Sequence, residues 1–219
     1  MKILLLGATG RTGKCIIEEA LKRDHKISAI ARNPDKLKAY DLEITQGSPY
    51  DFEAVEKAIA GCEAVINTLN VSRTSDNPWA RLAAPKDMIS KSAANTIKAM
   101  EKAGIKRFVA LSTIGAGSSW KKTPLALRLV VSISNLKHAF LDHSKQEDIL
   151  KNSSMDYTIC RAPMLDTNVN KTGAVATPEE VKPASMHLSR NSAAEFFINI
   201  LENSGHIRET VHLSNKPEA

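Results

Sequence analysis

Three glycines spaced three residues apart near the start of the chain constrain its fold more than any other feature. An apolar run at residues 3–6 leads into Gly7, Gly10 and Gly13. Apolar residues at helical spacing then follow, namely Ile16, Ile17, Ala20 and Leu21. A strand, a glycine turn and an amphipathic helix in this order are the context in which a glycine pattern predicts a nucleotide site.

The glycine turn is expected to hold a pyrophosphate. Gly7 allows a tight turn out of the strand, Gly10 lets the backbone approach the phosphates, and Gly13 lets the helix pack close to the sheet. Free N–H groups at the start of the helix attract negative charge. No Lys-Ser or Lys-Thr follows the last glycine, which disfavours a P-loop. The predicted cofactor-binding residues here are Gly7, Thr9, Gly10, Arg11, Thr12 and Gly13.

The rest of the chain alternates between predicted strands and predicted helices. Further strands are expected at residues 27–31, 42–46, 64–69, 107–111, 157–161 and 210–213, and further helices at 52–60, 87–103, 136–151 and 189–203. Residues 118–135 are expected to be less regular, and 167–177 to form a loop or hairpin. This rhythm predicts an α/β fold of the Rossmann type, doubly wound, with a mostly parallel sheet and helices on both faces. We expect one domain over residues 1–219, with residues from about 163 to 219 completing the substrate pocket.

Composition narrows the possible partners and the location. The net charge is +6, but the basic residues are spread along the chain, and only 5% of residues are aromatic, so no nucleic-acid partner is expected. Three well-separated cysteines fit a reducing cytoplasm and give no metal-site spacing. The apolar run at 125–136 contains Arg128 and is too short to span a bilayer, so no membrane partner is expected either. A monomer or a homodimer is expected.

Arg32 decides which dinucleotide we expect. It lies 19 residues after Gly13, at the end of the second strand, where many NAD sites carry an acidic residue for the ribose 2′-hydroxyl. A guanidinium pairs instead with a 2′-phosphate, so NADP(H) is predicted over NAD(H), with Arg11 in support. Further predicted cofactor-binding residues, most of them at strand ends, are Asn33, Ser48, Asn67, Leu69, Arg73, Ser112, Thr113 and Pro163.

Three residues are candidates for catalysis. Ser112 ends the fifth strand, where its hydroxyl could bind a substrate carbonyl or the nicotinamide amide. His143 and Glu147 interrupt the apolar stripe of the helix at 136–151, which favours a site or an interface. A structural histidine with satisfied hydrogen bonds is an equally good interpretation.

The chain resembles the atypical short-chain dehydrogenase/reductase superfamily, and within it the NAD(P)H-binding reductases that include biliverdin reductase B (flavin reductase) and the NmrA-like proteins. The matching segments are residues 7–13, 31–34, 104–109, 111–113, 142–143 with 147, 156–159, 161–163 and 171–174. The resemblance implies an NADP-binding Rossmann fold and hydride transfer to a flavin, quinone or similar small acceptor. It also implies that Ser112 is the site serine.

Two departures from the family bear on the chemistry. The classical enzymes use Tyr-x-x-x-Lys, but Leu141 stands four residues before Lys145. Glu147 occupies a position where the resemblance implies a histidine, and an ionised carboxylate is a poor proton donor. The first hypothesis is therefore an NADPH-dependent flavin or quinone reductase, because such acceptors need mainly to be oriented. The alternatives are an NADP(H)-binding redox sensor of the NmrA-like type and, third, a nucleotide-sugar epimerase.

Overall fold

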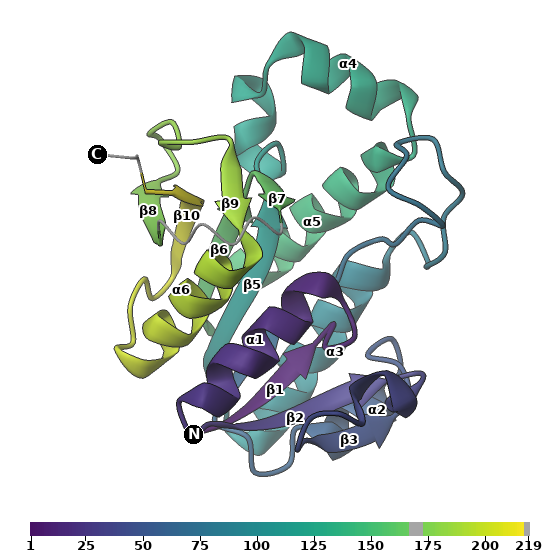
Figure 1. Ribbon diagram of the computed structural model, residues 1–219, viewed down its shortest axis with the longest axis vertical. Coiled ribbons are helices and arrows are strands. Elements are labelled where there is room, and N and C mark those ends of the chain that lie inside the picture. The colour runs from purple at the N-terminus through teal and green to yellow at the C-terminus, as the bar shows by residue number, and fades with distance from the viewer. Residues whose placement is uncertain (167–172, 217–219) are drawn as a thin grey trace.

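The computed structural model describes residues 1–166 and 173–216 (Figure 1). Its main sheet has the strand order β3-β2-β1-β4-β5-β6-β10-β8. Neighbouring strands pair in parallel, except that β8 pairs antiparallel with β10 at one edge. The strands of this sheet are β1 (Lys2–Leu6), β2 (Lys26–Ala31), β3 (Glu43–Gln46), β4 (Ala64–Asn67), β5 (Arg107–Thr113), β6 (Asp156–Ala162), β8 (Ala174–Pro178) and β10 (Glu209–Asn215). Two short strands, β7 (Met164–Asp166) and β9 (His187–Ser189), form a separate parallel pair.

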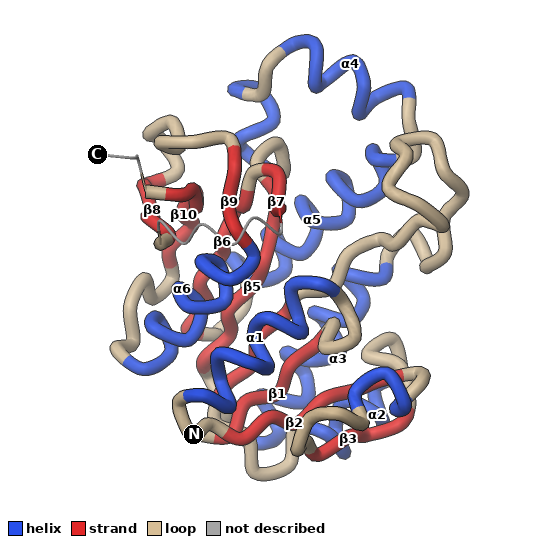
Figure 2. Tube along the Cα trace, viewed as in Figure 1, coloured by secondary structure: helices blue, strands red, loops and turns tan. Residues whose placement is uncertain are grey.

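Helices cover both faces of the sheet, as Figure 2 shows in blue against the red strands. On one face α1 (Arg11–Lys22) and α6 (Arg190–Glu202) bury an apolar cluster against the strands. On the other face α2 (Phe52–Ala58), α3 (Met88–Ala103) and α5 (Leu136–Lys151) do the same. The doubly wound, mostly parallel α/β sheet predicted from the sequence is confirmed.

Several local predictions are confirmed. The helix α5 has the predicted bounds, and α3 ends at Gly104, whose φ of +72° is the left-handed conformation that terminates helices. The strand β5 runs two residues further than expected, so Ser112 and Thr113 belong to the strand instead of following it. The short turn after β2 is the 3₁₀ helix η1 (Pro34–Leu37).

The expectation of an irregular segment at 118–135 was wrong. A 3₁₀ helix, η2 (Gly117–Lys122), is followed by the α-helix α4 (Leu125–Ile133), which forms the top of the molecule in Figure 1. Pro124 is the N-cap residue of α4, so its missing N–H removes no hydrogen bond from the helix. The strand expected at 64–69 ends at Asn67. The predicted loop or hairpin at 167–177 falls in part on residues 167–172, which lie outside the described residues, and its last residues belong to β8.

Candidate cofactor and substrate site

A pocket of about 390 Å³ opens at the carboxyl ends of the parallel strands. Its floor is the glycine turn after β1, and its sides come from the ends of β2, β4 and β5 and from the loop at 70–85. This is where ligands bind in open α/β sheets. Nine predicted cofactor-binding residues line it: Gly7, Thr9, Gly10, Arg11, Thr12, Arg32, Ser48, Leu69 and Arg73.

The glycine turn fits a bound pyrophosphate. The N–H of Gly10 donates to the carbonyl oxygen of Gly7 over 2.9 Å, which closes a tight turn. A Cβ on Gly13 would overlap the backbone of Gly7 and Ala8, so α1 can approach the strand only with glycine there. The residue before α1 is Gly10, which provides no side-chain cap for the first N–H groups of the helix. Gly13 itself packs against the turn and does not line the pocket.

Two helices begin with an arginine at this pocket. Arg11 is the first residue of α1 and Arg190 is the first residue of α6, and both side chains line the pocket. A cation at a helix start opposes the helix dipole, and neither first turn contains an acidic residue. Burial and then the charge of Arg11 lower the pKa of Arg190, which is 8% exposed. Among the residues that the structure describes, none forms an ion pair with Arg190. The two helix starts therefore make a positively charged wall suited to an anion.

Arg32 lies at the opposite end of the pocket, after β2, where the ribose of the adenosine half is expected. Its side chain is exposed and forms no ion pair with any residue in the described ranges. Ser48, after β3, also lines the pocket, and its Oγ accepts the N–H of Tyr50 over 3.2 Å. Asn33 has a local role instead, because its side chain accepts the N–H of Asp35 and caps η1.

The loop at 70–85 closes one side of the pocket. Arg73 and Leu82 form an antiparallel bridge within it, and the Nε of Arg73 donates to the carbonyl oxygen of Asn77 over 3.1 Å. The loop reaches α1 through a bidentate ion pair between Arg11 and Asp76, with the shorter contact at 2.8 Å. The Arg11 guanidinium lowers the pKa of Asp76. Because both side chains are exposed, the pair is weak, and Arg11 can turn to another anion.

Four predicted cofactor-binding residues lie near the site but have other contacts. Asn67 is fully buried, donates to Gln146 over 2.6 Å and accepts the N–H of Leu69. Asn67 therefore stabilises the end of β4 and does not line the pocket. Thr113 donates to the carbonyl oxygen of Ile114, and neither Ser112, Thr113 nor Pro163 lines the pocket.

The candidate catalytic residues Ser112 and Glu147 belong to a buried ion-pair network behind the pocket. The Oγ of Ser112 donates to the Oε1 of Glu147 over 2.7 Å. Arg161, a fully buried residue of β6, donates to both oxygens of Glu147, over 3.0 and 2.6 Å, and to Glu179 over 3.1 Å. Ser112 and Arg161 are register partners on β5 and β6. The carboxylate of Glu147 is thus held as the partner of a buried guanidinium.

His143 is buried one turn before Glu147 on α5, and it too lies outside the pocket lining. Its Nδ1 has no hydrogen-bond partner among the described residues, and burial lowers its pKa to about 4. The ring is therefore neutral at pH 7. Asp142, beside it, accepts the N–H of Ile89 over 2.7 Å and binds the hydroxyl of Ser90, which caps the start of α3.

The sequence reasoning missed two arginines that matter here. Arg190 is the second residue of the helix predicted at 189–203, and a cation at a helix start was the available signal. Arg161 stands in an otherwise apolar strand, and a lone charge there requires a buried partner. The structure also adds Val71, Leu111 and Leu165 as apolar pocket residues.

The described ranges 1–166 and 173–216 lack two features, a metal site and a membrane-spanning helix. They contain no group of three His, Cys, Asp or Glu side chains placed to hold a metal ion. In those same ranges no helix combines the length and apolar character needed to cross a bilayer.

Fold, pocket and sequence define the class of protein. The sequence profile of the NAD(P)H-binding family matches residues 7–204, so the chain belongs to this family of NAD(P)H-binding, oxidoreductase-type proteins. This confirms the resemblance to atypical short-chain dehydrogenases/reductases and the expectation of a nicotinamide dinucleotide cofactor.

Individual relatives are more distant. The photosystem II assembly factor Ycf39 of Synechocystis is 28% identical over 162 residues, which are 73% of this chain but only 43% of that protein. ChuY, an anaerobilin reductase from Escherichia coli, superposes with a TM-score of 0.81 at 20% identity over the full length of both chains. A short-chain dehydrogenase/reductase from Veillonella parvula, solved with NADP, gives a TM-score of 0.77 at 19% identity, covering 100% of this chain and 99% of that one. At these identities the two structures establish a shared fold.

Proposed function

We propose that this protein is an NADPH-dependent reductase that transfers a hydride to a flavin, quinone or similar small acceptor. The observation that carries the proposal is the charge of the pocket. Arg11 and Arg190 stand at two helix starts on one side, and Arg32 stands at the end of β2 on the other. A dinucleotide carrying a pyrophosphate and a 2′-phosphate matches both positions.

Arg32 supports NADPH over NADH. It occupies the strand end where an acidic residue would bind a free ribose 2′-hydroxyl, and a guanidinium binds a phosphate there with charge-assisted hydrogen bonds. Ser48 lies beside it in the lining and offers a hydroxyl to the same half of the cofactor. The bound dinucleotide would supply the hydride, while the chain binds and orients it.

The contacts of the two candidate acids Glu147 and His143 support an acceptor that takes its proton from water. Both oxygens of Glu147 are occupied by hydrogen bonds from Arg161, and the pKa of His143 is lowered to about 4, so the His143 ring holds no transferable proton at pH 7. Flavins and quinones accept a hydride into their own ring systems. The apolar residues Val71, Leu111 and Leu165 give the pocket surfaces for such a ring. ChuY, a protein of the same fold, is an anaerobilin reductase, which supports a reductase function without specifying the acceptor.

The test is direct. Purified protein is mixed with NADPH and either FMN or a soluble quinone such as menadione, and the loss of NADPH absorbance is followed. We expect oxidation above the uncatalysed background, weaker with NADH, and nearly lost in Gly13→Val, where the side chain overlaps the glycine turn. Background rates with every acceptor would contradict the reductase proposal without affecting the family assignment.

A second candidate is an NADP(H)-binding sensor of the NmrA-like type. It is favoured by the contacts of Ser112, Glu147 and His143, all of which lie outside the pocket lining. Such a protein binds NADP and NADPH with different affinities and turns over neither. Titration of both forms, together with the turnover assay, separates the two candidates.

A further inference from the structure

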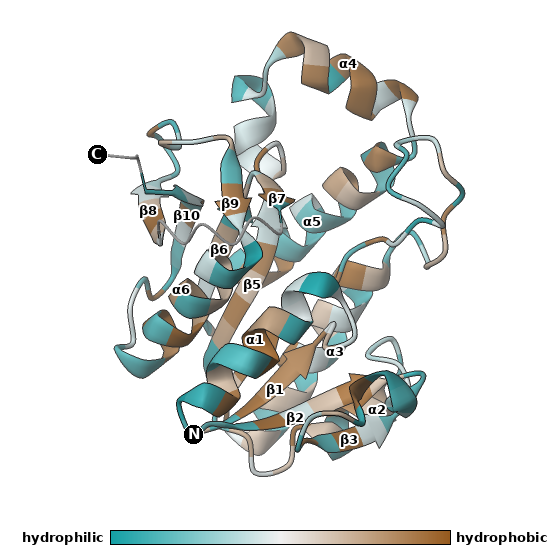
Figure 3. Cartoon of the chain, viewed as in Figure 1, coloured by the Kyte–Doolittle hydropathy of each residue, from teal (hydrophilic) through white to brown (hydrophobic). Residues whose placement is uncertain are grey.

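The helix α4 exposes an apolar stripe that the cofactor site does not use. Leu125, Leu129 and Ile133 follow one another at intervals of four residues, and their exposed fractions are 78%, 61% and 60%. The opposite side of the helix is anchored by Val131, which is 1% exposed. Figure 3 shows the brown of this helix at the outer end of the molecule. An ordered apolar row of this kind on a surface marks an interaction site.

An exposed tryptophan belongs to a segment that contacts the end of α4. Trp79, from the loop at 70–85, is 56% exposed. Its position next to the end of α4 is fixed by Asn135, which donates to the carbonyl oxygens of Trp79 and Ala80 over 3.2 and 3.1 Å. The backbone N–H of Asn135 donates in addition to Pro78. We call Leu125, Leu129, Ile133 and Trp79 the α4 surface.

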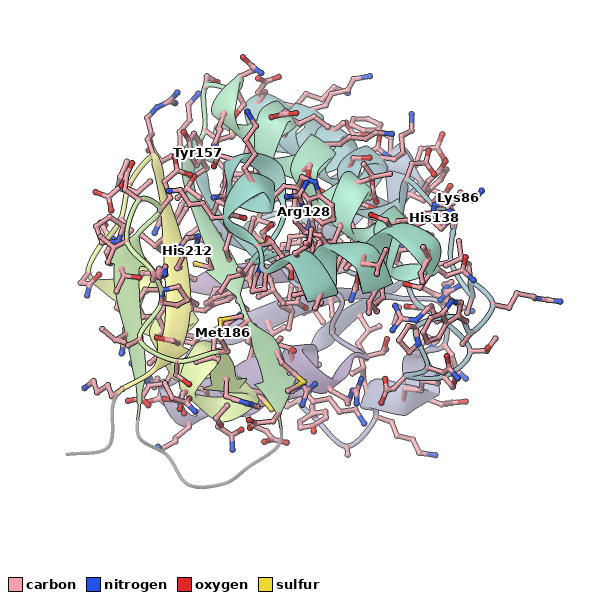
Figure 4. The ribbon with its side chains drawn as sticks, turned by 90° about the horizontal axis from the view of Figure 1, so that it is seen from above. Lys86, Arg128, His138, Tyr157, Met186 and His212 are labelled. Atoms are coloured by element: carbon pink, nitrogen blue, oxygen red, sulfur yellow. The ribbon has the colours of Figure 1, made fainter. Side chains whose placement is uncertain are left out.

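The chain segment that contains α4 carries charges of one sign. From residue 102 to residue 141 the sequence contains no Asp or Glu, and the exposed lysines Lys121 and Lys137 stand just before and just after α4. In the view from above, Lys86 and His138 lie side by side at one edge of this end of the molecule (Figure 4). Burial, and then Lys86 and Lys137, lower the pKa of His138. The lysines on either side of α4 therefore place positive charge next to the α4 surface.

The sequence predicts no membrane partner because this segment is too short to span a bilayer, but an apolar helix can lie on a membrane without crossing it. We propose that the α4 surface docks on the surface of an anionic phospholipid bilayer. An apolar helix face with a tryptophan and flanking lysines is the arrangement that lies in a membrane interface, where apolar side chains enter the acyl boundary and cations meet the headgroups. The charge argues against a second copy as the occupant. A twofold dimer through this face would bring each set of lysines toward its own equivalent.

Docking would also place the cofactor pocket beside the lipid. The loop at 70–85 carries Trp79 on the α4 surface and lines the pocket with Val71, Arg73 and Asp76. A quinone dissolved in the bilayer would then lie near the pocket mouth, a consequence that rests on the proposed reductase function. The docking itself does not, so vesicle binding and turnover can fail independently.

The full-length protein is tested by co-sedimentation with vesicles of phosphatidylcholine, with and without phosphatidylglycerol. We expect binding to the anionic vesicles, which salt weakens, and little binding to pure phosphatidylcholine. The double variant Lys121→Gln/Lys137→Gln should bind roughly thirty-fold more weakly, because each lysine near the surface contributes about a fivefold change. The matched control Lys26→Gln/Lys57→Gln, which removes two exposed lysines elsewhere, should bind like the wild type.

The apolar part is tested by Leu125→Ser/Leu129→Ser, which should reduce binding at least about tenfold, and by the exposed Ile207→Ser as its control. Tryptophan emission gives a second readout, because the chain has only Trp79 and Trp120. Vesicles should shift the emission to the blue, and Trp79→Phe should abolish the shift. Unchanged vesicle binding of Lys121→Gln/Lys137→Gln and of Leu125→Ser/Leu129→Ser would overturn the proposal. So would a dimer that the leucine variant dissociates, because that result assigns the surface to a second copy.

Discussion

At the scale of single residues, the arginines of the pocket occupy two separate positions where an anion can bind. Arg11 and Arg190 flank the glycine turn, and Arg32 stands at the far end. Arg11 is held by Asp76 in an exposed pair, whereas Arg32 has no ion-pair partner among the described residues. Arg32 is thus available without first breaking a contact, and it is the residue at which a preference between the two cofactors can be tested.

Replacing Arg32 with glutamine is expected to reduce the affinity for NADPH by roughly 10- to 100-fold, the value of about 1.5–3 kcal/mol for hydrogen bonds to a charged group. The affinity for NADH should change by less than about threefold, because that cofactor has no 2′-phosphate. Fluorescence titration of both cofactors measures the two constants, and NADH serves as the internal control. An equal loss for both cofactors would show that Arg32 does not read the 2′-phosphate.

His143 makes folding sensitive to acid. Its pKa is lowered to about 4 in the folded chain from an ordinary value of 6.5, so below pH 6.5 the unfolded chain binds a proton that the folded chain refuses. The free energy of unfolding should therefore fall by up to about 1.4 kcal/mol per pH unit as the pH drops from 6.5 toward 4, with no contribution above 6.5. In His143→Leu this part of the slope should vanish. Urea unfolding of both proteins at several pH values gives the slopes, and parallel curves would exclude a neutral buried His143.

At the scale of elements, Gly117 couples the start of η2 to the buried ion pair. Its φ is +51°, and a Cβ would lie 2.5 Å from the Oε2 of Glu147 and 2.9 Å from the Nη2 of Arg161. Gly104, at the end of α3, has a φ of +72° but no atom within 4 Å of such a Cβ. A side chain at either position would adopt a strained left-handed backbone conformation. Only at Gly117 would it also meet neighbouring atoms.

Gly104→Ala should therefore destabilise the protein by about 1–2 kcal/mol, the cost of a left-handed alanine. Gly117→Ala should cost at least about twice as much, because it also displaces a buried pair whose disruption is worth about 3–5 kcal/mol. Denaturant unfolding of both variants measures the difference. Equal losses would mean that the ion pair adapts to the added methyl group without cost.

The elements themselves could be predicted largely from hydrophobic periodicity and glycine positions, because the central strands of the sheet are buried on both faces and the helices bury one stripe. The helix α4 was not predicted because its row of Leu125, Leu129 and Ile133 faces solvent instead of a core. The site was harder to predict from the sequence than the elements were. The glycine turn and Arg32 follow from local chain order, whereas Arg161 meets Glu147 only when β6 and α5 come together across fourteen residues. Nothing local distinguishes a carboxylate that serves a reaction from one that serves a buried arginine.

At the scale of the whole molecule, the pocket joins segments from the beginning, the middle and the end of the chain. The glycine turn, the loop at 70–85 and Arg190 all line it. A cofactor bound there contacts parts of the chain that separate on unfolding, so binding should stabilise the entire fold.

Thermal unfolding with NADPH at about 100 times its dissociation constant should gain about 2.7 kcal/mol, which raises Tm by roughly 5–10 °C for a chain of this size. NADH at the same concentration should give a smaller shift. The contrast between the two cofactors should disappear in Arg32→Gln. A Tm that responds to neither cofactor would contradict the pocket as a dinucleotide site, whatever the turnover assay shows.

The ion pair between Glu147 and Arg161 also restricts how the sequence can change over time. Loss of Arg161 leaves the buried Glu147 without a cation, and loss of Glu147 leaves the buried Arg161 with only Glu179 as an ion-pair partner, so most single steps away from this pair pass through a destabilised protein. Lineages that descend from this chain should therefore exchange both residues together or keep both. We therefore expect positions 147 and 161 to covary among its relatives, with position 117 staying glycine wherever the pair persists. Such covariation would show that this salt bridge has been retained by selection.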